Sequence, residues 1–355
     1  MGNIFSNFRG RRVFVTGHTG FKGSWIAYLL HEIGAEVMGF ALPPAGKVNH
    51  FDLLRLDKKI THFEGDIRDG VCLTKALHDF QPEFVFHLAA QALVKPSYED
   101  PVATFSTNVV GSVNLLEAVR GCSSVRVLVY ITSDKCYENV EWVWGYREND
   151  LLGGRDPYSA SKAAAEIAFS SYARSFFEKM PQLGAASTRA GNVIGGGDWA
   201  IDRIIPDCIR AIEAGEPVRL RNPAATRPWQ HVLEPLSGYL LLASRLYDEP
   251  KRWGGAWNFG PSTQEVRTVM EVAEVIIRHL GRGQIEVTQS LAQVHEANLL
   301  QLNCDKAHQR LDWHPRWRVD KTLEATALWY KTVMSGGSAE QITRAQLYEF
   351  FPEWS

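Results

Sequence analysis

Two polar side chains, Tyr158 and Lys162, have the spacing of an acid–base pair. They are four residues apart at the start of a predicted helix, so both lie on one face of it. A phenol has a pKa of about 10, and a nearby ammonium or other positive charge would stabilise the phenolate. Tyr158 is therefore predicted to act as a base near neutral pH, with Lys162 supporting it. Because the motif is common by chance, its meaning depends on what precedes it.

Three more reactive residues follow a strand without a break. The run from Val125 to Thr132 is apolar and β-branched, which predicts a strand, and Ser133, Asp134 and Lys135 come directly after it. Ser133 is expected to hydrogen-bond the substrate oxygen that Tyr158 deprotonates. Burial would shift the pKa values of an aspartate and a lysine toward their neutral forms, an acid and a base. An ordinary ion pair in a loop is the alternative interpretation of this Asp-Lys pair.

A glycine-rich turn near the start of the chain predicts where a cofactor is held. The apolar run Val13 to Val15 ends at a G-x-x-G-x-x-G sequence, after which apolar residues recur at helical spacing. A strand, a glycine turn and a helix in this order present free backbone N–H groups and the positive end of the helix dipole, which favours a pyrophosphate. The first and second glycines are separated by two residues, whereas the usual dinucleotide fingerprint, G-x-G-x-x-G, has one residue between them. The predicted contacts are Gly17, Thr19, Gly20, Phe21, Lys22 and Gly23.

Later strand ends are expected to complete the cofactor site. The strand from Glu36 to Phe40 is followed neither by the carboxylate that usually holds the adenosine ribose nor by an arginine for a 2′-phosphate, so the residues alone leave NAD and NADP open. Asp66 follows another strand, where it could reach an adenine amino group. Small residues after the strand that starts at Phe84 leave room for a ligand. The remaining predicted cofactor residues are Ile67, Leu88, Ala89, Ala90 and Asn108, the last with a solvated helix face as the alternative.

Apolar strands and amphipathic helices alternate along most of the chain, which predicts an α/β fold. We expect a Rossmann-type doubly wound parallel sheet with a smaller mixed α/β substrate-binding domain. Residues 1–190, together with about 230–262, are assigned to the dinucleotide-binding Rossmann domain. Residues 191–229 and 263–355 are assigned to the substrate-binding domain. Gln230–Val232 and Trp257–Gly260 are expected to rejoin the main sheet.

Arginines gather after the regular alternation ends. With a formal charge of −2 the chain has no basic field, so a phosphate must be met by local arginines, whose forked geometry suits it. The same charge argues against nucleic acid as a partner. The predicted substrate-binding residues are Arg189, Asn192, Arg203, Arg221 and Arg227.

Composition limits the remaining classes. The chain has 355 residues, of which 45% are hydrophobic and 22% charged, as in soluble globular proteins. It lacks an 18-residue apolar run and an apolar signal sequence, so we expect no membrane partner. Its 5 cysteines show no C-x-x-C spacing, so neither a metal site nor a disulfide framework is predicted, and a reducing, cytoplasmic setting is expected.

These motifs together resemble the extended short-chain dehydrogenase/reductase family over nearly the whole chain. Many nucleotide-sugar epimerases and dehydratases of that family share Tyr158 and Lys162. An acid directly after Ser133 resembles the sugar 4,6-dehydratases. Asp134-Lys135, where dTDP-glucose enzymes have Asp-Glu, resembles the CDP-glucose 4,6-dehydratases, as do the His18–Gly23 form of the turn and the sequence Arg227-Pro228-Trp229-Gln230-His231-Val232.

The resemblance implies a lyase that uses NAD and dehydrates CDP-D-glucose to CDP-4-keto-6-deoxy-D-glucose, in deoxysugar biosynthesis of the O-antigen or lipopolysaccharide type. It implies transient hydride transfer to NAD, elimination of water and hydride return, with Ser133, Asp134, Lys135, Tyr158 and Lys162 as the catalytic set. Lys135 would remove the proton on carbon 5, and Asp134 would protonate the leaving carbon-6 hydroxyl. Arg189 and Asn192 match family contacts to the diphosphate.

Two further expectations concern assembly and alternatives. The helices predicted at Pro101–Arg120 and Ala160–Phe177 resemble the family's dimer bundle, so a homodimer or homotetramer is expected. The alternatives are a nucleotide-sugar 4-epimerase, which has no need for Asp134 and Lys135, and a dehydratase for another nucleotide sugar. A non-catalytic nucleotide sensor or scaffold on the same fold is a third.

Overall fold

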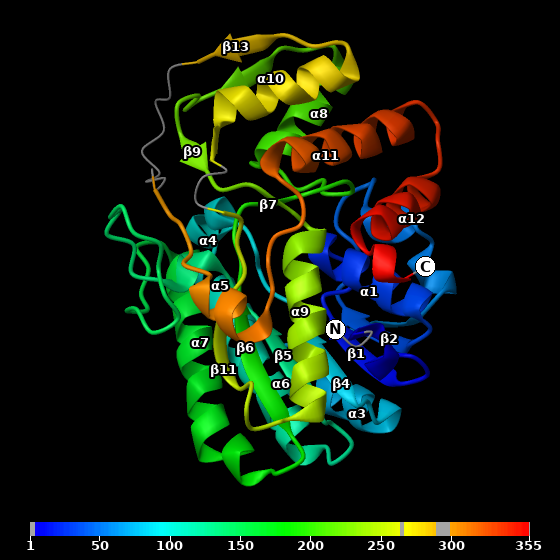
Figure 1. Ribbon diagram of the computed structural model, residues 1–355, viewed down its shortest axis with the longest axis vertical. Helices are drawn as coiled ribbons and strands as arrows, with labels where there is room; N and C mark the ends of the chain where they lie inside the picture. Colours follow the sequence, from blue (N-terminus) through cyan, green and yellow to red (C-terminus); the bar gives the residue numbers. More distant parts are fainter. Residues whose placement is uncertain (1–3, 263–265, 289–298, 355) are drawn as a thin grey trace.

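A seven-stranded parallel sheet forms the centre of the computed structural model, which describes residues 4–262, 266–288 and 299–354 (Figure 1). The strand order is β3-β2-β1-β4-β5-β6-β11. The first strand is central and the chain winds outward on both sides, so the predicted Rossmann-type, doubly wound fold is confirmed. The strands are β1 (Arg12–Thr16), β2 (Glu36–Ala41), β3 (Thr61–Glu64), β4 (Phe84–His87), β5 (Val127–Ile131), β6 (Gly184–Arg189) and β11 (Gly255–Asn258).

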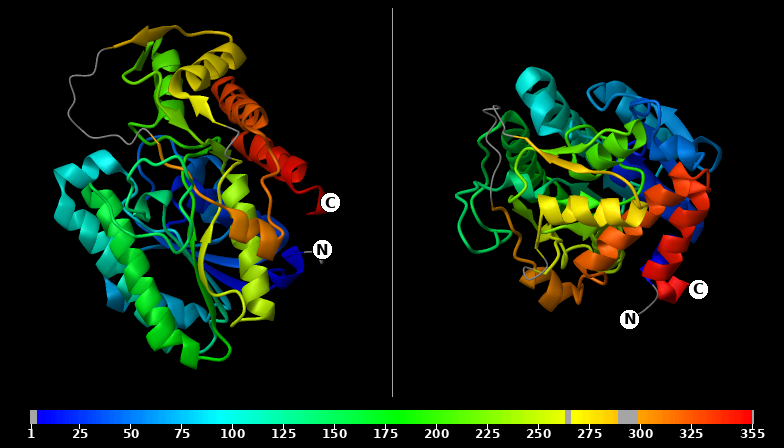
Figure 2. Two further views of the ribbon diagram at one scale, coloured as in Figure 1. Left: turned by 60° about the vertical axis from the view of Figure 1, so that its left-hand side comes forward. Right: turned by 90° about the horizontal axis from the view of Figure 1, so that it is seen from above.

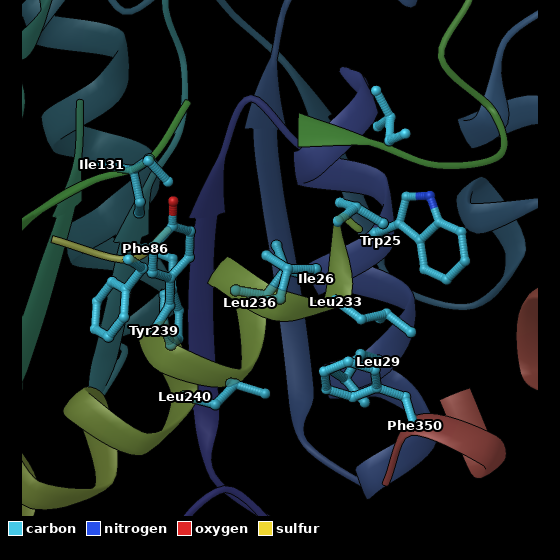
Figure 3. Close-up of a cluster of buried hydrophobic side chains, with 14 of the residues drawn as sticks. Trp25, Ile26, Leu29, Phe86, Ile131, Leu233, Leu236, Tyr239, Leu240 and Phe350 are labelled. Atoms are coloured by element: carbon cyan, nitrogen blue, oxygen red, sulfur yellow. The ribbon is translucent and has the colours of Figure 1, made fainter. Parts of the chain in front are cut away.

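Helices cover both faces of this sheet, which explains why the inner strands β1, β4 and β5 are apolar on both sides. One face carries α1 (Phe21–Ile33) and α9 (Leu233–Asp248), whose apolar side chains face each other over the strands (Figure 3). The other face carries α3 (Gly70–Phe80), α6 (Ser112–Gly121) and α7 (Pro157–Ser175). The C-terminal helix α12 (Ala339–Phe350) contributes Phe350 to the apolar cluster formed by α1 and α9.

A smaller group of elements lies beyond the carboxyl ends of the strands, in the upper part of Figure 1. Two amphipathic helices lie there, α10 (Val269–Leu280) and α11 (Val319–Met334). They accompany α8 (Ile204–Ala214) and two short ribbons, seen from two other directions in Figure 2. The ribbons pair β8 (Val218–Leu220) with β13 (Ile285–Val287), and β9 (Thr226–Arg227) with β12 (Arg267–Thr268).

Two predicted elements differ in the structure. Gln230–His231 (β10) pairs with Val193–Ile194 (β7) in a separate two-stranded sheet, so the prediction that it rejoins the main sheet is wrong. β11 already occupies the free edge of β6, as predicted for the segment that contains Trp257. The predicted helix from residue 101 to 120 is also divided: α5 (Pro101–Phe105) and α6 are joined by a π-helical segment, Ser106–Gly111.

The length and apolarity of the helices bear on the membrane prediction. No helix within the three described ranges is long and apolar enough to cross a membrane.

Candidate active site

The turn between β1 and α1 has the backbone shape that the glycines predict. Gly17 has a φ of +76°, and a Cβ atom there would lie 2.7 Å from the backbone nitrogen of Ala89. The Thr16 hydroxyl accepts hydrogen bonds of 3.2 Å from the backbone N–H groups of Leu88 and Ala89, which joins the turn to the end of β4. The N-cap residue of α1 is Gly20, and no side chain caps the helix. An open helix N-terminus beside the small residue Ala89 suits a pyrophosphate.

The other predicted cofactor residues surround this turn in different ways. Leu88, Ala89 and Ala90 are half-buried. Asp66 pairs with Arg68, and this hydrogen bond holds the pKa of its carboxyl below the usual range. The side chain of Ile67 belongs to the core, so only its backbone is available to a ligand.

Asn108 is placed differently from the prediction. It is buried in the π-helical segment, where its amide oxygen accepts from the Gln91 backbone N–H at 2.8 Å. Its amide nitrogen donates to the Gln91 carbonyl at 3.0 Å and to the Ser161 hydroxyl at 2.8 Å. Because both ends of the amide are engaged, Asn108 braces the loop after β4 against α7. It does not present its amide to a cofactor.

The end of β5 and the start of α7 bring three predicted catalytic side chains together. Ser133 caps the 3-10 turn Asp134–Cys136, and its hydroxyl donates to the Asp134 carboxylate at 2.9 Å. The Asp156 side chain caps α7, which begins at Pro157, so Tyr158 lies in its first turn. There the buried phenol lies near the Ser133 side chain, close enough for that hydroxyl to act on its pKa. Lys135 is half-buried in the same 3-10 turn, which packs against α7.

Burial dominates the ionisation of the Tyr-Lys pair. It raises the pKa of Tyr158 to about 12, with the Asp134 charge acting in the same direction and the Ser133 hydrogen bond opposing it. It lowers the pKa of Lys162 to about 8, with the charge of Lys22 adding to the shift. The predicted lowering of the Tyr158 pKa is therefore not found in the protein by itself, because desolvation of the phenolate outweighs the attraction of nearby cations.

Asp134 faces a pocket whose shape depends on one glycine. The pocket is lined by Asp134, Gly191 and Asn192, with Gln230 and Leu302 on its other sides. A side chain at position 191 would overlap the Asp134 carboxylate, so the acid keeps its place only because this residue is glycine. Asn192 follows with a φ of +51°, a strained value that asparagine tolerates better than most residues.

The predicted substrate arginines have unlike surroundings. Arg203 donates to Asp198 at 2.7 Å, and its charge acts on Tyr158, so it lies beside the catalytic cluster. Arg221 is exposed and forms a 3.5 Å ion pair with Asp202. Arg227 is buried in β9 and donates to the Thr226 carbonyl.

The surroundings of Arg189 differ from the predicted contact with the substrate's diphosphate. Its guanidinium is buried and forms a 2.9 Å ion pair with Glu166, and it also donates to the Tyr137 hydroxyl and the Glu148 carbonyl. It is therefore occupied by the protein and does not face a ligand's diphosphate. Glu166 itself was not predicted from the sequence. The available signal was spacing, since Tyr158, Lys162 and Glu166 follow one another at intervals of four on one helix face.

Comparison with known proteins places these motifs within a matched region. A family model described as GDP-mannose 4,6 dehydratase matches residues 14–326, which include the glycine turn and residues 133–162. The CDP-glucose 4,6-dehydratase of Salmonella typhimurium strain LT2 is 48% identical over 338 residues, which cover 94% of both chains. A dTDP-glucose 4,6-dehydratase of Xanthomonas campestris is 27% identical, over 90% of this chain and 92% of the relative.

Solved structures share the same architecture. The UDP-glucose 4-epimerase of Thermus thermophilus in complex with NAD has a TM-score of 0.77 and 28% identity, over 90% of this chain and 99% of the other. A dTDP-glucose 4,6-dehydratase of Streptomyces venezuelae with NAD and TYD bound has a TM-score of 0.78 at 24% identity, over 93% and 99%. The second likeness concerns the fold alone.

Proposed function

Because the chain belongs to the GDP-mannose 4,6 dehydratase family, we propose that it is an NAD-dependent hydro-lyase that converts CDP-D-glucose to CDP-4-keto-6-deoxy-D-glucose for deoxysugar biosynthesis. One observation supports this proposal most: Asp134 lines a pocket, accepts a hydrogen bond from Ser133, and lies near enough to the buried phenol of Tyr158 for its charge to act on it. A 4-epimerase would need the phenol but not the acid. The identity of 48% to a CDP-glucose enzyme supports the choice of nucleotide sugar.

NAD fits the residues at the glycine turn. The uncapped N-terminus of α1 suits its pyrophosphate, and Leu88, Ala89 and Ala90, which follow β4 beside the turn, are half-buried. NAD would supply a hydride acceptor for carbon 4 of the sugar and return the hydride to carbon 6. We assign this role to the Rossmann domain, residues 1–190 with about 230–262, and sugar-nucleotide binding to the remainder.

The chain's own residues move the protons. Ser133 holds the carbon-4 oxygen while Tyr158 removes its proton, and the ketone that forms acidifies the hydrogen on carbon 5. Lys135, as the neutral amine, takes that proton. Asp134, in its protonated form, gives its own to the carbon-6 hydroxyl, which leaves as water. Lys162 supports the phenolate of Tyr158.

Charged side chains near this cluster suit the substrate's diphosphate. Arg203 lies beside Tyr158, and Arg221 and Arg227 belong to the same group of elements beyond the sheet. Guanidinium groups bind phosphates in pairs of hydrogen bonds. We propose these three, with Asn192, as the substrate contacts.

A panel of nucleotide sugars tests the proposed function. CDP-glucose should give a base-labile keto sugar detectable by its ultraviolet absorbance, with kcat/KM at least about 100-fold above that for dTDP-, GDP- and UDP-glucose. A product that is only a stereoisomer of the substrate would reject dehydration. If a sugar linked to another nucleobase is dehydrated faster, CDP-glucose is not the substrate, but the proposed reaction type still holds.

The pH dependence should report Lys162. Lys162 is fully protonated well below pH 8 and loses its proton as the pH rises through its lowered pKa of about 8. Because the charged form supports the phenolate, kcat should fall above that pH. Replacing Lys22 by methionine removes a charge that lowers this pKa, and should move the alkaline limb to higher pH at saturating NAD. If the alkaline limb of the pH profile stays at the same pH in this variant, it reports the titration of a group other than Lys162.

Exposed apolar side chains on adjacent helices favour assembly with a second copy of the chain. They include Val102 on α5, Val110 in the π-helical segment, and Ile167 on α7, with exposures of 79%, 53% and 58%. These elements pack side by side on one flank of the molecule (Figure 2, left). We propose a homodimer or homotetramer that uses this flank. All 5 cysteines are free, which suits the proposed cytoplasmic setting.

The oligomer proposal is tested by a charge on that flank. Ile167→Lys should shift the protein toward a smaller species in sedimentation velocity, because a lysine cannot be desolvated there without a partner. Val71→Lys, at an 83% exposed position on α3, is the matched control and should leave the assembly intact. Equal behaviour of both variants would exclude this flank as the interface.

A further inference from the structure

A buried ion pair lies behind the catalytic cluster and bonds to three elements at once. Glu166 and Arg189 are 2% and 3% exposed, and their charged groups are 2.9 Å apart. One carboxylate oxygen of Glu166 accepts from the Thr132 hydroxyl, and the other accepts from the Ser187 hydroxyl at 2.8 Å. Glu166 therefore ties α7 to the ends of β5 and β6.

These anchor points adjoin the residues assigned to catalysis. Thr132 directly precedes Ser133, and Arg189 comes three residues before Asn192. Glu166 is one helical turn beyond Lys162 and two beyond Tyr158. A shift of α7 relative to β5 would thus change the distance between Tyr158 and Ser133, which come from different elements.

Arg189 extends the network to the other side of the site. Its guanidinium donates to the Tyr137 hydroxyl at 2.7 Å and lies over the ring, and Tyr137 donates to Asn258 at 2.8 Å. The Asn258 amide donates to the Asn303 carbonyl at 3.0 Å. The pair is therefore connected to the chain immediately after the 3-10 turn that carries Asp134 and Lys135.

Stability alone does not account for two charges in this position. Replacing a buried ion pair by apolar side chains of similar size usually leaves the stability of a protein unchanged or higher. Removing one partner leaves an unpaired buried charge, which is destabilising. Here the carboxylate satisfies two hydroxyl donors as well as the arginine, and it also acts on the Lys162 charge in the direction opposite to burial.

We propose that Glu166 and Arg189 are positioning residues for the dehydration: their ion pair holds the helix that carries Tyr158 and Lys162 in register with the strand ends that carry Ser133, Asp134 and Asn192. The inference rests on the proposed function. The pair touches no reacting atom and acts only through the residues that it holds.

Three variants separate positioning from stability: Glu166→Gln, Arg189→Met and the double variant. The single variants should lose thermal stability, and the double variant should recover most of it, because no unpaired charge remains. All three should lose about 100-fold in kcat with KM changed less than about threefold, as expected for misplaced catalytic groups. In Glu166→Gln the alkaline limb of the pH profile should also move to lower pH. The matched control is Glu32→Gln with Arg344→Met, a pair of 2.9 Å between α1 and α12, which should leave kcat unchanged.

Recovery of kcat together with stability in the double variant would overturn the proposal, as would a loss confined to KM. Backbone hydrogen exchange at residues 133–137 provides a readout without substrate: it should accelerate in the double variant but not in the control pair, and equal protection would also overturn the proposal. Assays use whichever nucleotide sugar the unmodified protein consumes. Failure of CDP-glucose therefore counts against the proposed substrate and not against the ion pair, and hydrogen exchange decides the matter if no sugar is consumed.

Discussion

Replacing Tyr158 by phenylalanine should lower kcat by about 10³-fold, because the buried ring remains while the hydroxyl that we propose takes the carbon-4 proton is removed. The phenol is buried, and the phenylalanine ring fills the space of the tyrosine ring. Substrate binding, measured by calorimetry, should change little. Quenched single-turnover samples should contain neither keto sugar nor reduced dinucleotide.

Tyr172→Phe is the matched control for this experiment. Tyr172 lies on the same helix, but its hydroxyl is bonded to Glu117 on α6, away from the cluster. This variant should retain the rate of the unmodified protein. Near-normal oxidation in Tyr158→Phe would transfer the role of base to another residue.

Replacing Lys135 by alanine should separate the two halves of the reaction. In the proposed mechanism the first oxidation depends on Tyr158 and Ser133, which remain, whereas proton removal from carbon 5 loses its base. We expect turnover to fall by about 10² to 10³-fold. In a single turnover the absorbance of reduced dinucleotide should appear and persist, and carbon 5 should take up no deuterium from D₂O.

Lys95→Ala, an exposed lysine that forms a 3.8 Å ion pair with Asp202, controls for general loss of charge. It should behave as the unmodified protein does. If Lys135→Ala slows oxidation and deuterium uptake equally, Lys135 contributes to assembling the site and is not the specific base at carbon 5.

The centre of the sheet could be predicted because β1, β4 and β5 are short, mostly apolar runs whose side chains are buried. The helix α9 could not be predicted in the same way. Every residue from Leu233 to Ser244 is buried, so no polar face marks its period in the sequence. Its position was therefore recognisable only once the sheet beneath it was known (Figure 3).

The candidate site was predictable at the level of segments but not of side-chain direction. Arg189 ends a strand whose ligand-facing and helix-facing sides alternate, and nothing in the sequence indicates on which side its guanidinium lies. In the structure it shares a side with Ser187, two residues earlier, and both bond to Glu166. Asn108 likewise has a polar side chain in an apolar helix, but its partners Gln91 and Ser161 are distant in sequence.

The π-helical turn between α5 and α6 fixes how the two halves of this long helix are oriented. Such a turn holds one residue more than an α-helical turn, and a single residue corresponds to a rotation of about 100° around the axis. Val102, which is exposed on α5, and Leu116, which is buried on α6, owe their opposite surroundings partly to that extra residue. Inserting or deleting one residue in Ser106–Gly111 would rotate α5 relative to α6. The exposed side chains of α5 and the hydrogen bonds of Asn108 to the loop after β4 would then both change direction, although no side chain in either set is removed.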